Sequence, residues 1–95
     1  MRVTVRYMAQ LRTAAGAADE AVEIDGPCTV AELASRLAAR HGEALRRLLL
    51  ASDGRLSPII LVFVNDVQVG PEDDRPLSDG DVMTLLSPIA GGQMR

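Results

Sequence analysis

Few residues of this 95-residue chain are of types that perform chemistry, and they are scattered along it. Cys28 is the sole cysteine and precedes a predicted helix, whose positive N-terminal end can lower the pKa of a thiol. His41 is the sole histidine, so no histidine pair exists to bind a metal ion. We favour the simpler interpretations: Cys28 as a small half-buried residue in a turn, and His41 as a helix-capping or solvated residue.

Two charged stretches also lack the pattern of a site. Glu72-Asp73-Asp74 does not have the spaced ligands of a calcium loop, which favours a solvated turn. Arg46 and Arg47 are adjacent on a predicted helix and point in different directions, which favours a solvated face over an anion site. We find no glycine-rich phosphate loop, nucleophile elbow or Ser-His-Asp set. The chain is therefore predicted not to be an enzyme by itself, and to bind no metal or cofactor.

The remaining candidate is the C-terminal segment "SPIAGGQMR". Pro88 cannot donate to a sheet ladder and restricts the residue before it, so the chain should leave the sheet there as an extended arm. Gly91 and Gly92 remove the side chains from the end of that arm. Such an arm can thread a narrow channel and bring a carboxyl group to a buried site on another protein. The alternative is a flexible terminus without a function.

Length and composition limit the number of domains and the kinds of partner that the chain can have. With 95 residues, 47% of them apolar, and a formal charge of −3, the chain should form one domain with one core. The only aromatic residues are Tyr7 and Phe63, which offer no stacking platform for nucleic acid. Without a long apolar run or a basic signal segment, we expect no membrane association and a cytoplasmic location. All ten basic residues are arginine, so the chain has no side-chain amine.

Hydrophobic periodicity predicts the elements of the first half. "MRVTVRYM" and "EAVEIDG" alternate as half-buried strands do, with Leu11 tucked inward in a loose connection between them. "TVAELASRLAARHG" has helical spacing, with a capping box formed by Thr29 and Glu32 and with Gly42 at its end. "EALRRLLLAS" follows as a shorter helix.

The second half is predicted to complete a sheet. "PIILVFVNDVQV" is a nearly continuous apolar run, typical of a central strand covered on both faces, with a tight turn at Asn65-Asp66 before Val67–Val69. Residues 82–87 form the last strand. The order indicates an α+β fold of β-grasp type, a mixed sheet of four or five strands covered by one main helix. Because both faces of the last strand are apolar and the helix covers only one, Met83 and Leu85 are a possible docking face.

The stretches "VTVRYMAQLRTAAG", "TVAELASRLAARHG", "FVNDVQV" and "GDVMTLLSPIAGG" together resemble the ubiquitin-like sulfur carriers. This family includes the small subunit of molybdopterin synthase and the carriers of thiamine and cysteine biosynthesis. The resemblance spans residues 2–92. It implies that an ATP-consuming activating enzyme adenylates the Gly92 carboxylate, that a thiocarboxylate then forms there, and that a sulfur-incorporating enzyme receives the sulfur. Pro88, Ile89, Ala90 and Gly91 would be the partner-binding arm.

Gln93-Met94-Arg95 depart from that pattern, because most members of these families end at the second glycine. Some are made with a short extension that a metal-dependent protease removes. We therefore predict three segments: a domain of residues 1–87, an arm of residues 88–92 and a removable extension of residues 93–95, cleaved between Gly92 and Gln93. The cysteine-type or secondary-metabolite pathway is favoured. A molybdopterin synthase subunit, a protein modifier conjugated through Gly92 and a binding module with an inert tail are the alternatives.

Overall fold

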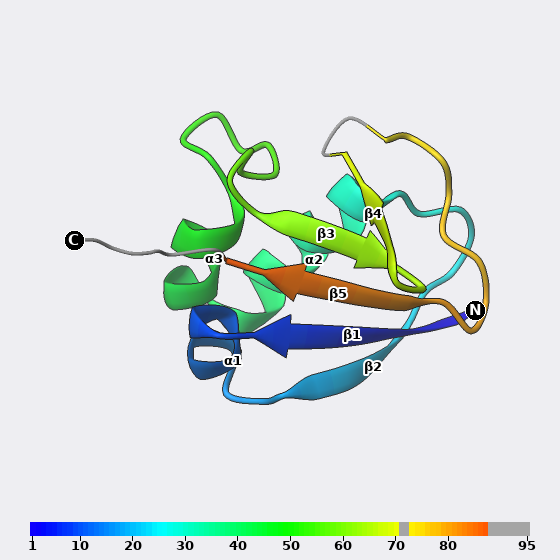
Figure 1. Cartoon of the computed structure of the whole chain (residues 1–95), viewed down its shortest axis with the longest axis horizontal. Helices are drawn as coiled ribbons and strands as arrows, with labels where there is room; N and C mark the ends of the chain where they lie inside the picture. The colour runs from blue at the N-terminus through cyan, green and yellow to red at the C-terminus, as the bar shows by residue number, and fades with distance from the viewer. Residues whose placement is uncertain (71–72, 88–95) are drawn as a thin grey trace.

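The computed structural model describes residues 1–70 and 73–87 (Figure 1). Five strands and three helices occur within these residues. In chain order they are β1 (Arg2–Met8), α1 (Gln10–Ala15), β2 (Asp19–Glu23), α2 (Val30–His41), α3 (Glu43–Leu49), β3 (Leu61–Val64), β4 (Val67–Val69) and β5 (Val82–Leu86). None of the helices in these described ranges is long and apolar enough to cross a membrane.

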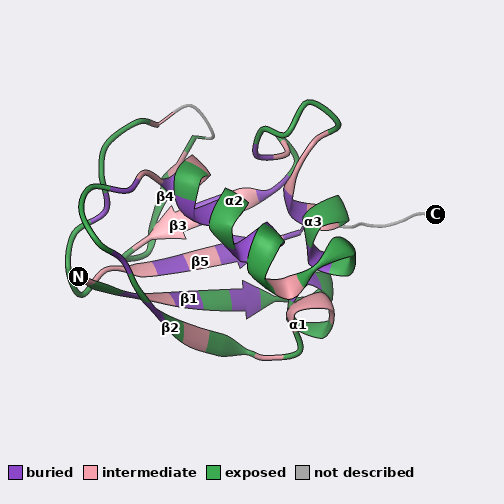
Figure 2. Cartoon of the chain, turned by 180° about the vertical axis from the view of Figure 1, so that it is seen from behind, coloured by how far each residue is buried: buried purple, intermediate pink, exposed green. Residues whose placement is uncertain are grey.

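The five strands form one mixed sheet in the order β2-β1-β5-β3-β4. β1 and β5 are parallel, whereas the β1–β2, β3–β5 and β3–β4 pairs are antiparallel. α2 crosses one face of this sheet, and within the described part of the chain no helix lies on the other face (Figures 1 and 2). This is the β-grasp arrangement that the order of elements predicts, so that prediction is confirmed.

The core lies between the sheet and α2, and strand alternation selects its members. Along β1, Val3, Val5 and Tyr7 are fully buried, whereas the residues between them are partly or fully exposed. Figure 2 shows the same alternation along β5 from the helix side. The buried residues of α2 recur at helical spacing: Val30, Leu33, Ala34, Leu37 and Ala38.

The ends of α2 are fixed by local chemistry. The Thr29 hydroxyl accepts a hydrogen bond from the backbone N–H of Glu32 at 3.2 Å, and the Glu32 carboxylate accepts one from the N–H of Thr29 at 2.9 Å. Gly42, with a φ of 95°, ends the helix and donates its N–H to the carbonyl of Ala38. The predicted capping box and glycine stop are both confirmed.

The connection after β1 is more ordered than the sequence predicts. Instead of a loose loop, residues 10–15 form the short helix α1, which fully buries Leu11 and ends at Gly16 in the left-handed conformation. Helix α1 has only six residues, too few for its apolar positions to show helical periodicity, so only the inward position of Leu11 could be predicted.

β3 also differs from its prediction. It lies next to the edge strand β4, and although Val62 is buried, Leu61 and Phe63 on the opposite face are only partly buried. The apolar run therefore does not mark a strand covered on both faces. It marks a strand whose second face is apolar and left open.

Candidate functional site

The strand that leads into the arm is held on both sides. β5 lies between β1 and β3, and its last residue, Leu86, is paired with Met8 on one side and Leu61 on the other. Ser87, the next residue, is 5% exposed. The predicted arm, Pro88–Gly92, and the predicted cleavage position at Gly92-Gln93 lie outside the described residues. The strand before the predicted arm therefore lies in the middle of the sheet.

The predicted docking face is wrong. Met83 and Leu85 are fully buried, because they point toward the face of the sheet that α2 covers. The residues between and beside them, Val82, Thr84 and Leu86, are only partly buried and point the other way. Alternation identified the two faces of β5 correctly, but because both are apolar it could not tell which of them the helix covers.

The uncovered face carries an apolar patch around the start of the arm. In one row across the sheet, Met8, Leu86 and Leu61 are neighbours, and in the next row Arg6, Thr84 and Phe63 are neighbours. Residues paired in this way project from the same face. Met8 is 39% exposed although it is a large apolar side chain. We call these six residues the open sheet face: Arg6, Met8, Leu61, Phe63, Thr84 and Leu86.

Cys28 is not placed to react. Its side chain is fully buried, burial raises the pKa of its thiol, and its Sγ lies 3.5 Å from the carbonyl oxygen of Thr29. A neutral thiol is a poor nucleophile. The interpretation of Cys28 as a structural residue is confirmed, although it is more deeply buried than predicted. In residues 1–70 and 73–87 no three His, Cys, Asp or Glu side chains come together as metal ligands.

His41 has a role that sequence reasoning missed. Its Nε2 lies 2.6 Å from Oε1 of Glu20, which also accepts a hydrogen bond from the buried hydroxyl of Tyr7. The rings of Tyr7 and His41 meet edge to face at 5.8 Å, and Arg40 lies 3.7 Å from the other Glu20 oxygen. This cluster joins β1, β2 and the end of α2. The sequence contained one signal: Glu20 alternates with the apolar residues Val22 and Ile24, so it is predicted to point toward the core as they do.

Glu20 should make the stability of the fold depend on pH. Burial disfavours the Glu20 carboxylate, but the hydrogen bonds from Tyr7 and His41 and the charges of His41 and Arg40 outweigh burial and lower its pKa. A lowered pKa in the folded state stabilises the fold above the ordinary value of 4.5, and this contribution is lost as the pH falls through the folded value. We expect Glu20→Gln to lower the free energy of unfolding at pH 7 by about 1–3 kcal/mol.

Urea denaturation of the wild type and Glu20→Gln at pH 7 and pH 3 measures this difference. The difference in the free energy of unfolding between the two proteins should be smaller at pH 3 than at pH 7. Glu23→Gln is the matched control, because Glu23 pairs with Arg2 at 2.5 Å but both side chains are 68% exposed, and it should have little effect. A difference that is the same at both pH values would contradict a contribution from the charge of Glu20.

Of the described residues of the two charged stretches, Arg46, Arg47 and Asp74 are exposed, as predicted, whereas Asp73 is partly buried. Arg46 and Arg47 both pair with Glu43 on the exposed side of α3, at 3.9 and 3.1 Å. Asp73 accepts hydrogen bonds from the side chain and backbone of Arg75, which lower its pKa to about 2. Glu72 lies outside the described residues.

Comparison with known proteins gives a consistent result. The model of the ThiS family matches residues 5–92. The molybdopterin synthase sulfur carrier subunit of Chlamydomonas reinhardtii is 26% identical over 92 residues, which cover 97% of this chain and all of that protein. The crystal structure of SAMP1, a small archaeal modifier protein, from Haloferax volcanii has a TM-score of 0.84 and 27% identity, covering 97% of this chain and 100% of that chain. A chain of the BexX/CysO complex from Amycolatopsis orientalis has a TM-score of 0.66 and 35% identity, covering 95% of this chain and 99% of that chain.

Proposed function

Because the chain belongs to the ThiS family and is a ubiquitin-like sulfur carrier, we propose that it carries sulfur as a thiocarboxylate on Gly92. One observation carries this proposal above the others. The strand in the middle of the sheet leads directly to Pro88–Gly92, and the family match ends at residue 92, before the last three residues of the sequence. The fold thus supplies a rigid base, and the arm supplies the reacting atom.

The proposed chemistry requires no catalytic side chain from this chain. A carboxylate is a poor electrophile, so an activating enzyme first transfers the adenylyl group of ATP to the Gly92 carboxylate and releases pyrophosphate. A sulfur donor then attacks the acyl carbon, a C–S bond forms, and AMP leaves with the oxygen that joined it to the carbonyl. The carrier contributes position, since it holds the acyl carbon on an arm that the partner can enclose. The chain itself holds no cofactor, and ATP is consumed by the activating enzyme.

Three residues follow Gly92, and we propose that a metalloprotease removes Gln93-Met94-Arg95 before activation. On this view residues 1–87 are the β-grasp domain, residues 88–92 the working arm and residues 93–95 an extension. The charged guanidinium of Arg95 is costly to transfer from water into a narrow channel. We place processing, activation and sulfur transfer in the cytoplasm, where ATP is available.

The proposed acceptor is a sulfur-incorporating enzyme of the cysteine-type or secondary-metabolite group. The 35% identity with the chain of the BexX/CysO complex favours this group. The carrier subunit of molybdopterin synthase, at 26% identity, is the alternative. We further propose that the activating enzyme binds the open sheet face, in place of Met83 and Leu85, because this apolar surface surrounds the point where the arm begins.

A protein modifier is the second candidate, because SAMP1 has the same fold over 97% of this chain. A modifier would form an amide bond between Gly92 and amines of other proteins. It could not form chains through its own side chains, because the sequence contains no lysine.

Denaturing gels of host-cell lysate, probed with an antibody against the chain, distinguish the two functions. A sulfur carrier should give one band, and the mass of the recovered protein should correspond to a terminus at Gly92 with one oxygen replaced by sulfur. A ladder of larger bands that disappears in a Gly92→Ala strain would instead support the modifier. A single band that still ends in Arg95 would contradict both.

A further inference from the structure

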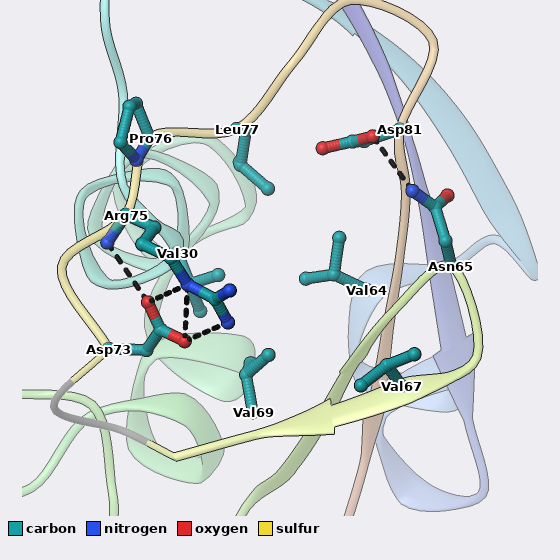
Figure 3. A pocket seen from close by; sticks show the side chains of 10 residues that line it. All are labelled: Val30, Val64, Asn65, Val67, Val69, Asp73, Arg75, Pro76, Leu77 and Asp81. Atoms are coloured by element: carbon teal, nitrogen blue, oxygen red, sulfur yellow. Dashed lines mark hydrogen bonds and ion pairs between the residues drawn. The ribbon is translucent and has the colours of Figure 1, made fainter.

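A pocket of about 340 Å³ lies at the other end of β5 from the arm (Figure 3). It is bounded by the start of α2, the β3–β4 hairpin and residues 73–81. Its apolar lining consists of Val30, Val64, Val67, Val69, Pro76 and Leu77. Val67 is 63% exposed, so its side chain is accessible to a ligand in the pocket. The volume suits one or two aliphatic side chains of a ligand.

Charged groups stand at two sides of this apolar lining (Figure 3). On one side, Arg75 binds the carboxylate of Asp73 with an Nη2–Oδ2 distance of 2.7 Å, so this pair is neutral overall. On the other side, Asp81 accepts one hydrogen bond on each oxygen, from the side chain of Asn65 and from the backbone of Ser78, both at 2.8 Å. A carboxylate oxygen can accept a further hydrogen bond, so Asp81 can also accept one from a cation.

The surroundings of the pocket are strongly acidic. Residues 65–70 and 73–81 contain five aspartates and one arginine, so these two segments have a formal net charge of −4, and two of the aspartates, Asp73 and Asp81, line the pocket. The aspartates are Asp66, Asp73, Asp74, Asp79 and Asp81. A surface of this charge attracts cationic groups and repels nucleic acid.

We propose that this pocket is a second docking site, which takes a segment of a partner protein that carries an aliphatic side chain next to arginine or lysine. The aliphatic side chain would fill the space between Val64, Val67 and Leu77, and the basic residue would lie against Asp81 and the surrounding aspartates. The pocket adjoins the first residues of β5, whereas the arm follows the last. A partner bound here leaves the arm free, so the carrier can be held by one protein while another acts on Gly92.

Titration of the isotope-labelled full chain with the peptide acetyl-Arg-Leu-Arg-amide, followed by amide chemical shifts, tests the proposal. The largest shifts should occur at Val30, Val64 and Val67. The peptide acetyl-Arg-Ala-Arg-amide should bind about tenfold more weakly, because it lacks the aliphatic group that the pocket would bury. Val67→Ser should also weaken binding of the leucine peptide. The variant should stay folded, since Val67 is 63% exposed.

Two double variants with the same change in net charge separate the pocket from general charge attraction. Asp66→Asn with Asp74→Asn removes two of the five negative charges in these segments, and asparagine tolerates the φ of 69° at position 66. Asp19→Asn with Asp25→Asn is the control. The first pair should weaken the leucine peptide about fivefold and the control less than about twofold. Equal weakening by both pairs, equal binding of the two peptides, shifts centred on the open sheet face, or no shifts at millimolar peptide would each overturn the proposal.

Discussion

Only a chain that ends at Gly92 should exchange a terminal oxygen for sulfur when it is incubated with an activating enzyme, ATP and a sulfur source. A chain of residues 1–95 carries its carboxyl group on Arg95, three residues beyond the position to which the family match extends. An arginine side chain is long, permanently charged and strongly solvated, so it should not enter a channel that accepts two glycines. We therefore expect a chain of residues 1–95 to show no exchange.

Intact-protein mass spectrometry of three forms measures this result: the full-length chain, the chain truncated after Gly92, and the truncated chain with Gly92→Ala. The alanine form is the matched control, because it has the same length and differs by one methyl group at the reacting residue. It should react much more slowly than the native truncated form if the channel fits glycine closely. Gain of sulfur by a chain that retains Arg95, or failure of the native truncated form with a cognate activating enzyme, would contradict the carrier mechanism at Gly92.

The fold could be predicted where a residue type has one structural meaning. Thr29 with Glu32 three residues later is a capping box, and the structure contains both of its hydrogen bonds. The turn at Asn65-Asp66 could also be predicted from residue type. Both residues have positive φ, which short polar side chains tolerate better than most others. Such signals depend on neighbours within a few residues, so one sequence is enough to interpret them.

The docking surface could not be predicted in this way, because hydrophobicity does not say what a residue is buried against. Met83 and Leu86 are equally apolar, but α2 fully buries the first, whereas the second is left partly exposed beside the arm. The same ambiguity led us to expect β3 to be covered on both faces, although Leu61 and Phe63 are only partly buried. In the sequence, an apolar residue that contacts a partner protein looks the same as one that packs in the core. Only the position of α2 distinguishes the two.

That distinction has a direct experimental consequence at the open sheet face. Phe63→Glu and Met8→Glu should each lower kcat/KM for adenylation of the chain truncated after Gly92 by about 10-fold to 100-fold, because large apolar side chains at the centre of an interface contribute most to binding. Both side chains are partly exposed, so we expect the fold to be retained. Met83→Glu should instead unfold the domain, because it places an unpaired charge in the core.

Ala39→Glu is the matched control, since it also introduces a glutamate at an exposed apolar residue, but on α2, on the other side of the sheet from the open sheet face. Adenylation rates with the activating enzyme, together with melting temperatures of all four variants, separate loss of docking from loss of folding. If Phe63→Glu and Met8→Glu are folded and are adenylated as fast as Ala39→Glu, the activating enzyme does not use the open sheet face. The activating enzyme would then have to recognise the arm alone. The apolar surface formed by Met8, Leu86 and Leu61 would need another explanation.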